Sequence, residues 1–155
     1  MKNIQLCGLG NGLVDLEITI SSQQLEELGI QKGTMTLVSE NEQLELLTKL
    51  SHAEPFQCSG GSVANSIIAF SALGGKAAHK TILGNDKFGN FYAQEFLDLG
   101  IKLDAEKVDN LTTGTCAVLI TEDAERTLFT SLGVNATYGK SNINPSTIEQ
   151  SEWLY

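Results

Sequence analysis

The sequence has little of what marks nucleic-acid-binding, membrane-spanning or secreted proteins. It holds 10 lysines and arginines against 19 aspartates and glutamates, for a net charge of −9 at pH 7. The basic face that proteins use on nucleic acid is therefore missing, and an anionic membrane surface would repel the chain. No apolar run approaches the ~20 residues of a membrane span, and the N-terminus lacks a signal-peptide core. We therefore expect a small-molecule partner, and neither nucleic acid nor membrane.

Cysteine is also scarce. The three residues, Cys7, Cys58 and Cys116, are widely spaced and odd in number, without the spacing of a metal site. We expect reduced, mostly buried thiols in a cytoplasmic protein, and no metal ligands in this chain. A length of 155 residues suits one ordinary domain with a real core.

The order of strand-like and helix-like segments predicts an α/β fold. Apolar or alternating residues predict strands at 4–8, 77–83 and 153–155, and half-exposed strands near 16–20, 34–38, 115–120 and 127–130. Helical spacing predicts helices at 23–28, 41–50, 62–73 and from Phe88 to Leu99, with a shorter one at 145–150. These segments fit a mostly parallel core sheet with helical layers. The four half-exposed strands could form a smaller sheet that covers a site.

The most informative segment is Ser-Gly-Gly-Ser-Val-Ala-Asn at 59–65, which precedes the almost continuously apolar helix. Paired glycines let the backbone approach a ligand closely, because no Cβ stands in the way. They also open a helix whose first amides are free to donate hydrogen bonds. Asn65 falls near the first turn and offers a donor and an acceptor. Such a loop suits a polyhydroxylated small molecule.

The glycines at 8–12 begin like a dinucleotide-binding fingerprint, but Leu13 stands where the third glycine belongs and a strand follows. A Rossmann cofactor site is therefore not expected. The turn still lies at the carboxyl end of the first strand, where open α/β sheets bind ligands. Asn11 and Asp15 are well placed there for neighbouring ligand hydroxyls. The alternative is that Asp15 only caps a turn.

Other polar candidates carry weaker signals. Lys140 and Ser141 end like a phosphate-binding loop, but the upstream glycine is misplaced, so we interpret this segment as an ordinary loop. Arg126 could reach into a cleft from a covering sheet or lie on the surface. His52 and His79 have no partner pattern and are interpreted as surface or satisfied structural histidines.

Taken in order, the motifs resemble the N-terminal half of a PfkB-type (ribokinase-like) kinase, most closely its adenosine-kinase-like branch. The segments that carry the resemblance cover almost the whole chain: 10–15, 32–37, 60–65, 73–75, 84–89, 125–127 and 132–135. Val63 and Ile67 depart from the glycine-rich signature, where the family usually has smaller residues. We expect these two side chains to narrow the pocket.

The resemblance implies a ribokinase-like three-layer α/β domain with a small β-sheet lid, of which residues 1–155 form the N-terminal portion. The residues that it implies for the sugar moiety are Asn11, Asp15, Gly60, Gly61 and Asn65. Those that it implies for the rest of the acceptor pocket are Leu13, Leu37, Cys116 and Leu132. Arg126, on the lid, would approach the transferred phosphate. In this family the lid can also form a homodimer contact, and the sequence leaves the oligomeric state open.

The implied reaction moves the γ-phosphoryl group of ATP, with Mg²⁺, to a primary hydroxyl of a sugar or nucleoside. The apolar pocket residues slightly favour adenosine. The family's catalytic aspartate lies in a Gly-x-Gly-Asp motif of the C-terminal half, with most of the ATP site, and no such motif occurs here. We therefore expect no catalytic residue in this chain and no activity from it alone. The alternatives are a non-catalytic sugar- or nucleoside-binding module, and an unrelated α/β protein whose glycines are only structural.

Overall fold

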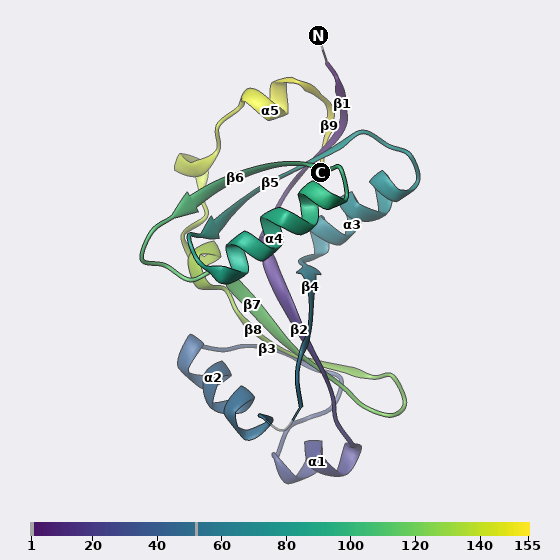
Figure 1. Ribbon diagram of the computed structural model, residues 1–155, viewed down its shortest axis with the longest axis vertical. Coiled ribbons are helices and arrows are strands. Elements are labelled where there is room, and N and C mark those ends of the chain that lie inside the picture. Colours follow the sequence, from purple (N-terminus) through teal and green to yellow (C-terminus); the bar gives the residue numbers. More distant parts are fainter. Residues whose placement is uncertain (1, 52) are drawn as a thin grey trace.

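The computed structural model describes residues 2–51 and 53–155, so the expectation for His52 lies outside the described residues. The chain forms an elongated molecule with an α/β layer at one end and a second sheet with two helices at the other (Figure 1). It crosses between the two sheets four times, at residues 10–12, 61, 109–113 and 132. We call this region the waist.

The core sheet is fully parallel, in the order β6-β5-β1-β9. Its strands are β1 (Ile4–Leu9), β5 (Ala77–Gly84), β6 (Lys102–Val108) and β9 (Ser151–Leu154). Helices α3 (Ser62–Ala72) and α4 (Lys87–Asp98) pack on it, and α5 (Ser146–Glu149) leads into β9 (Figure 1). Two 3-10 turns, η1 (Gly133–Thr137) and η2 (Lys140–Asn142), precede α5. The mostly parallel core expected from the sequence is confirmed.

The second sheet, which we call the lid sheet, has the order β3-β8-β7-β2-β4. Its strands are β2 (Leu13–Thr19), β3 (Met35–Leu37), β4 (Phe56–Gly60), β7 (Gly114–Ile120) and β8 (Arg126–Ser131). Helices α1 (Ser22–Glu27) and α2 (Glu40–Lys49) join its strands, and each begins with a capping box. The alternating strands predicted from the sequence therefore do lie together, with β4 added at one edge.

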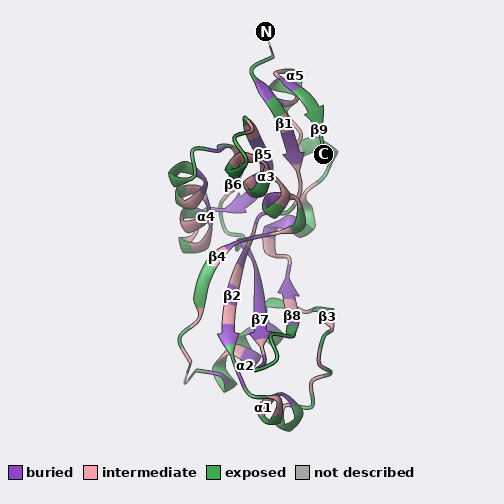
Figure 2. Ribbon diagram, turned by 90° about the vertical axis from the view of Figure 1, so that its right-hand side faces the viewer, coloured by how far each residue is buried: buried purple, intermediate pink, exposed green. Residues whose placement is uncertain are grey.

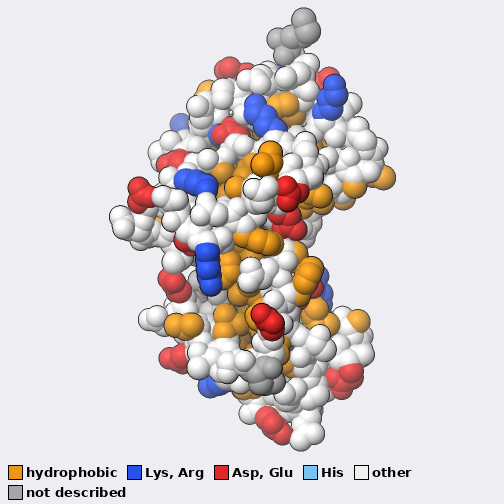
Figure 3. Space-filling view, in the orientation of Figure 1, with side chains coloured by type: hydrophobic (Ala, Val, Ile, Leu, Met, Phe, Trp, Pro, Cys, Tyr) orange, Lys and Arg blue, Asp and Glu red, His pale blue; other side chains and the backbone are white. Residues whose placement is uncertain are grey.

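Strand β2 connects the two ends of the molecule. Its buried residues Val14 and Leu16 pack with Tyr92 and Phe96 of α4 in the core of the α/β layer. Further along, the buried Ile18 belongs to a second apolar cluster at the far end of the lid sheet. Figure 2 shows β7 buried along most of its length, while buried and half-buried residues alternate along β2. In the orientation of Figure 1, hydrophobic side chains gather around the middle of the molecule, with charged side chains scattered over the same face (Figure 3).

One helix and two strands differ from what the sequence suggests. The almost continuous apolar run of α3 predicts a buried helix, but only Ala64 and Ile67 are buried, because one face packs on the core sheet and the other faces outward. Strands β4 and β6 were not predicted. Both lie at sheet edges, where polar side chains meet water and blur the apolar signal.

Candidate functional site

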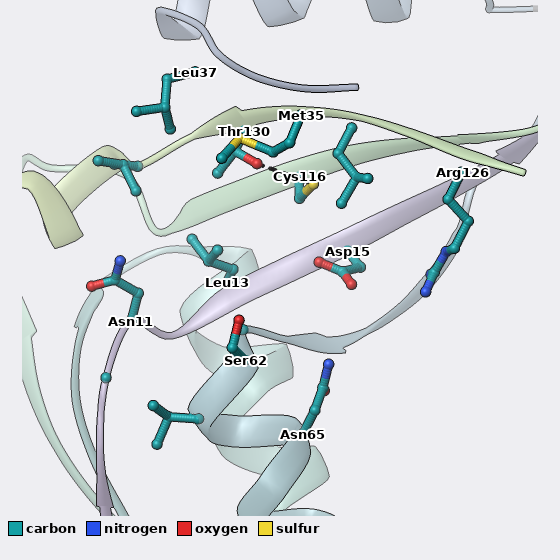
Figure 4. A pocket seen from close by; sticks show the side chains of 15 residues that line it. Asn11, Leu13, Asp15, Met35, Leu37, Ser62, Asn65, Cys116, Arg126 and Thr130 are labelled. Atoms are coloured by element: carbon teal, nitrogen blue, oxygen red, sulfur yellow. Dashed lines mark hydrogen bonds between the residues drawn. The ribbon is translucent and has the colours of Figure 1, made fainter. Parts of the chain in front are cut away.

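A cavity of about 660 Å³ lies between the lid sheet and the first turn of α3 (Figure 4). Its walls come from the turn after β1, the concave side of the lid strands and the start of α3. The residues singled out from the sequence that line it are Asn11, Leu13, Asp15, Leu37, Gly61, Asn65, Cys116, Arg126 and Leu132. The lining also includes Met35, Leu128 and Thr130, which the sequence did not indicate.

Strand register explains why residues so distant in sequence meet here. Asp15 of β2 lies beside Cys116 of β7, which lies beside Thr130 of β8, which lies beside Leu37 of β3. Since side chains alternate between the faces of a strand, this whole row points toward the cavity. The alternation of side chains along each strand therefore determines which of its residues face the cavity.

The adjacent glycines Gly60 and Gly61 have different structural roles. Gly61 caps α3 at φ 102°, and a Cβ there would lie 2.5 Å from the backbone oxygen of Asn11. Gly60 does not line the cavity, contrary to its expected contact with a ligand. A Cβ at Gly60 would lie 2.1 Å from Oδ1 of Asp15, so this glycine makes room for the carboxylate. Its contribution to the cavity is through Asp15.

Only one of the two larger residues in the glycine-rich segment lies at the cavity. Val63 lines it, whereas Ile67 is fully buried in the core. A Cβ at Gly8 would lie 2.5 Å from Cγ1 of Ile67, so Ile67 packs against the backbone of β1. The expectation that Ile67 narrows the pocket is wrong, because Ile67 lies one helical turn beyond Val63 on the same face of α3 and is buried over β1, away from the cavity.

The Asp15 carboxyl is the most perturbed acid of the cavity. Partial burial raises its pKa to about 6, the nearby Arg126 guanidinium opposes this rise, and Glu17 adds to it. At neutral pH the group is ionised and accepts hydrogen bonds, and in mild acid it takes up a proton. Asn11 and Asn65 are both exposed, and they lie on either side of Ser62, across the cavity from Met35 and Leu37 (Figure 4). Together these side chains present acceptors and donors to neighbouring hydroxyls.

Arg126 reaches the cavity, which decides between its two predicted positions. It begins β8, and its guanidinium donates to Oε1 of Glu17 in an ion pair. Glu17 lies two residues after Asp15 and therefore on the same face of β2. Glu17 was not singled out from the sequence, although the alternation predicted for residues 16–20 places it among the residues on one face of that strand.

A buried asparagine clamps the turn between β1 and β2. The Gly12 amide donates to Oδ1 of Asn135 at 3.0 Å, and Nδ2 of Asn135 donates to the Gly12 oxygen at 2.9 Å. Nδ2 also donates to the Leu132 oxygen at 3.2 Å. Asn135 is 5% exposed, and Gly12 is buried. The clamp fixes the turn that carries Asn11 and Leu13, a role that the sequence did not indicate.

The cysteines form no disulfide, as expected. Cys116 is buried in the cavity wall, where burial raises the pKa of its thiol and Thr130 Oγ1 donates to Sγ at 3.3 Å. It is therefore a neutral, apolar part of the lining. Burial raises the pKa of the Cys58 thiol to about 11 as well.

Metal ligands and membrane spans were not expected. Within residues 2–51 and 53–155, no three or more His, Cys, Asp or Glu side chains gather as a metal site would require. None of the helices described in that same part of the chain has the length and apolar character needed to cross a membrane.

Comparison with known proteins gives consistent matches. The model of the "pfkB family carbohydrate kinase" matches residues 34–155. Aminoimidazole riboside kinase of Salmonella typhimurium is 33% identical over 103 residues, which cover 64% of this chain and 31% of that protein. Adenosine kinase 1 of Arabidopsis thaliana is 23% identical over 97% of this chain and 45% of its own length.

The structure of adenosine kinase from Sinorhizobium meliloti superposes on the whole chain with a TM-score of 0.88 and 29% identity. The match covers 47% of that structure. The chain thus spans less than half the length of each of these three proteins.

Proposed function

Because the chain belongs to the pfkB family of carbohydrate kinases, we propose that it provides the acceptor site for transfer of the ATP γ-phosphoryl group to a primary hydroxyl of a sugar or nucleoside. Within that class we propose adenosine or a related riboside. The riboside and adenosine kinases among its relatives support this choice. These relatives are longer than the part that they share with this chain, so we propose the activity for a whole protein of their length.

The observation that carries the proposal is the two-sided character of the cavity. The polar groups of Asn11, Asp15 and Asn65 lie on the side of the cavity away from Met35 and Leu37 (Figure 4). The lid wall is apolar, and its members are Leu13, Met35, Leu37, Leu128 and Leu132. A riboside has the same two sides, since its ribose carries vicinal hydroxyls and its base is flat and largely apolar. A volume of about 660 Å³ accommodates such a molecule.

The chain's own residues would act mainly by positioning. The ionised Asp15 accepts hydrogen bonds from two neighbouring hydroxyls, and Asn65 and Asn11 fix their direction. Gly61 lets the ligand approach the amides at the start of α3. The lid sheet excludes water from the acceptor, and Arg126 approaches the transferred phosphoryl group. Phosphoryl transfer depends on such positioning and on charge stabilisation.

ATP and Mg²⁺ are the cofactors that we propose. The described residues offer no metal-binding cluster, so we assign no Mg²⁺ ligand in this chain and derive no step through the ion. Of the described residues that line the cavity, Arg126 is the one cation able to meet a phosphoryl group.

Calorimetry with adenosine, other ribosides, ribose and fructose tests the proposal. Replacing Asp15 or Asn65 by alanine should weaken binding by about 1–3 kcal/mol through lost hydrogen bonds. Asn144→Ala, in an exposed loop, is the matched control and should bind as the parent does. Unchanged affinity in both site variants would count against the acceptor site. Light scattering of the same samples tests whether the chain forms a homodimer through the lid sheet.

A further inference from the structure

We propose that Glu17 is a specificity-determining residue, which makes the cavity favour uncharged acceptors over acceptors that carry phosphate. The inference rests on the proposed function and adds a selection rule to it. Glu17 acts through Arg126, the single Lys or Arg among the described lining residues. By forming an ion pair with this guanidinium, Glu17 occupies the group that an anionic ligand would need, so a phosphoryl group reaches Arg126 only by displacing Glu17.

The geometry of the lid sheet places the pair at the cavity. Strand β7 separates β2 from β8, and Arg126 lies beside Ile120 of β7, two residues beyond the row that contains Glu17 and Val118. The long arginine side chain therefore crosses β7 diagonally to reach Glu17. The side chains of Glu17 and Arg126 are 26% and 50% exposed. Their ion pair is partly screened from water and open to a ligand on the cavity side.

The charges around the pair disfavour a bound phosphate. With Asp15 ionised, the lining residues Asp15 and Arg126 together with Glu17, the ion-pair partner of Arg126, carry two negative charges and one positive charge, which leaves one net negative charge. A phosphate group entering here must either displace Glu17 from Arg126 or remain beside both carboxylates without a cation. A neutral riboside meets neither penalty, since its hydroxyls donate to Asp15 directly.

Burial is the main cause of the raised pKa of Asp15, and the ion pair adds two smaller, opposing effects. Arg126 lowers the pKa of the Asp15 carboxyl, and Glu17 raises it. The titratable and charged groups that influence or adjoin Asp15 from the elements around it are Glu17, Cys58, Tyr92, Cys116 and Arg126. Burial keeps the thiols and the Tyr92 phenol neutral at pH 7, because it raises their pKa values. Removing the Glu17 charge should therefore lower the pKa of Asp15.

The test compares Glu17→Gln with the parent chain. Glutamine keeps the length of the side chain and an oxygen that accepts from Arg126, so only the charge is lost. Glu26→Gln is the matched control, since it removes the same charge from the exposed surface of α1. Calorimetry gives the affinities for adenosine, for adenosine 5′-monophosphate and for inorganic phosphate alone. Thermal unfolding of each variant verifies that it is folded.

The parent chain should bind adenosine more tightly than its monophosphate. Glu17→Gln should reduce this preference on the order of tenfold, through tighter binding of the monophosphate. Glu26→Gln should keep the parent preference. In the double variant Glu17→Gln/Arg126→Gln the gain should disappear, because it depends on the guanidinium.

An unchanged preference for adenosine over its monophosphate in Glu17→Gln would overturn the inference. An equal change in Glu26→Gln would overturn it too, because the effect would then come from the net charge of the chain and not from the ion pair. Binding of neither adenosine nor its monophosphate by any variant would overturn the proposed function instead. The affinity for inorganic phosphate then tests the role of Glu17 separately, because phosphate binding depends only on Arg126. Tighter phosphate binding by Glu17→Gln than by the parent supports the inference, and equal binding refutes it.

Discussion

Asn135→Ala should remove much of the molecule's stability without touching an apolar core. The change deletes three hydrogen bonds, at 3.0, 2.9 and 3.2 Å, and leaves the buried amide and oxygen of Gly12 without these partners. At roughly 1 kcal/mol per bond, and more for a buried group left unsatisfied, we expect a loss of about 3 kcal/mol. Stabilities of whole domains are about 5–15 kcal/mol, so this loss is large.

Urea unfolding measured by circular dichroism gives the free energy directly. For a chain of this size, a loss of about 3 kcal/mol corresponds to a fall of roughly 6–12 °C in Tm. Asn144→Ala is the control, because Asn144 accepts one exposed hydrogen bond, from the Ser146 amide at 2.9 Å. It should lose less than about 1 kcal/mol. If the two variants lose the same free energy, the reasoning about the clamp is refuted.

Three further predictions concern single groups. Asp15→Asn should raise the free energy of unfolding at pH 7.5 but not at pH 4, because burial raises the folded-state pKa to about 6 from 3.8 and ionisation then favours the unfolded chain. His79→Phe should abolish the loss of stability on acidification between about pH 6.5 and pH 4, since burial lowers the pKa of His79 to about 4 and the unfolded chain is protonated first. Urea titrations across this pH range check both signs; identical pH profiles for parent and variants would contradict them. Gly61→Ala, at φ 102°, should destabilise by roughly 2 kcal/mol or more and weaken riboside binding. Gly29→Ala, at φ 68° with nothing within 4 Å of the added Cβ, should cost only about 1 kcal/mol and leave binding intact.

Much of the fold could be predicted because local patterns determined it. The alternation in 16–20, 34–38, 115–120 and 127–130 indicated strands of one sheet, and that sheet is present. The glycine pair before α3 predicts a close approach of a ligand to the backbone, which stays a prediction, while the positive φ of Gly61 explains why a glycine stands there. Edge strand β6 was missed because its sequence, Lys-Leu-Asp-Ala-Glu-Lys-Val, mixes charge with small apolar residues.

The candidate site was predicted in its members but not in its interactions. Whether Asp15 titrates normally depends on how deeply it is buried, which no local pattern records. The clamp between Gly12 and Asn135 joins residues 123 positions apart. The partner of Arg126, Glu17, lies 109 positions away. Such pairs follow from the packing of the whole sheet, so a single sequence could not show them.

The four crossings of the waist also have a consequence for the growing chain. Strand β2 pairs with β4 along one edge. Along the other edge it pairs with β7, which is synthesised much later and whose Gly114 lies beside Leu13. At about 5–20 residues per second of synthesis, those roughly 100 residues correspond to about 5–20 s in which that edge has no partner. During this time a strand rich in valine, leucine and isoleucine is open to pairing with another nascent chain. Chaperone capture of ribosome-bound chains should therefore be strongest after β2 emerges, and should decline once β7 has done so.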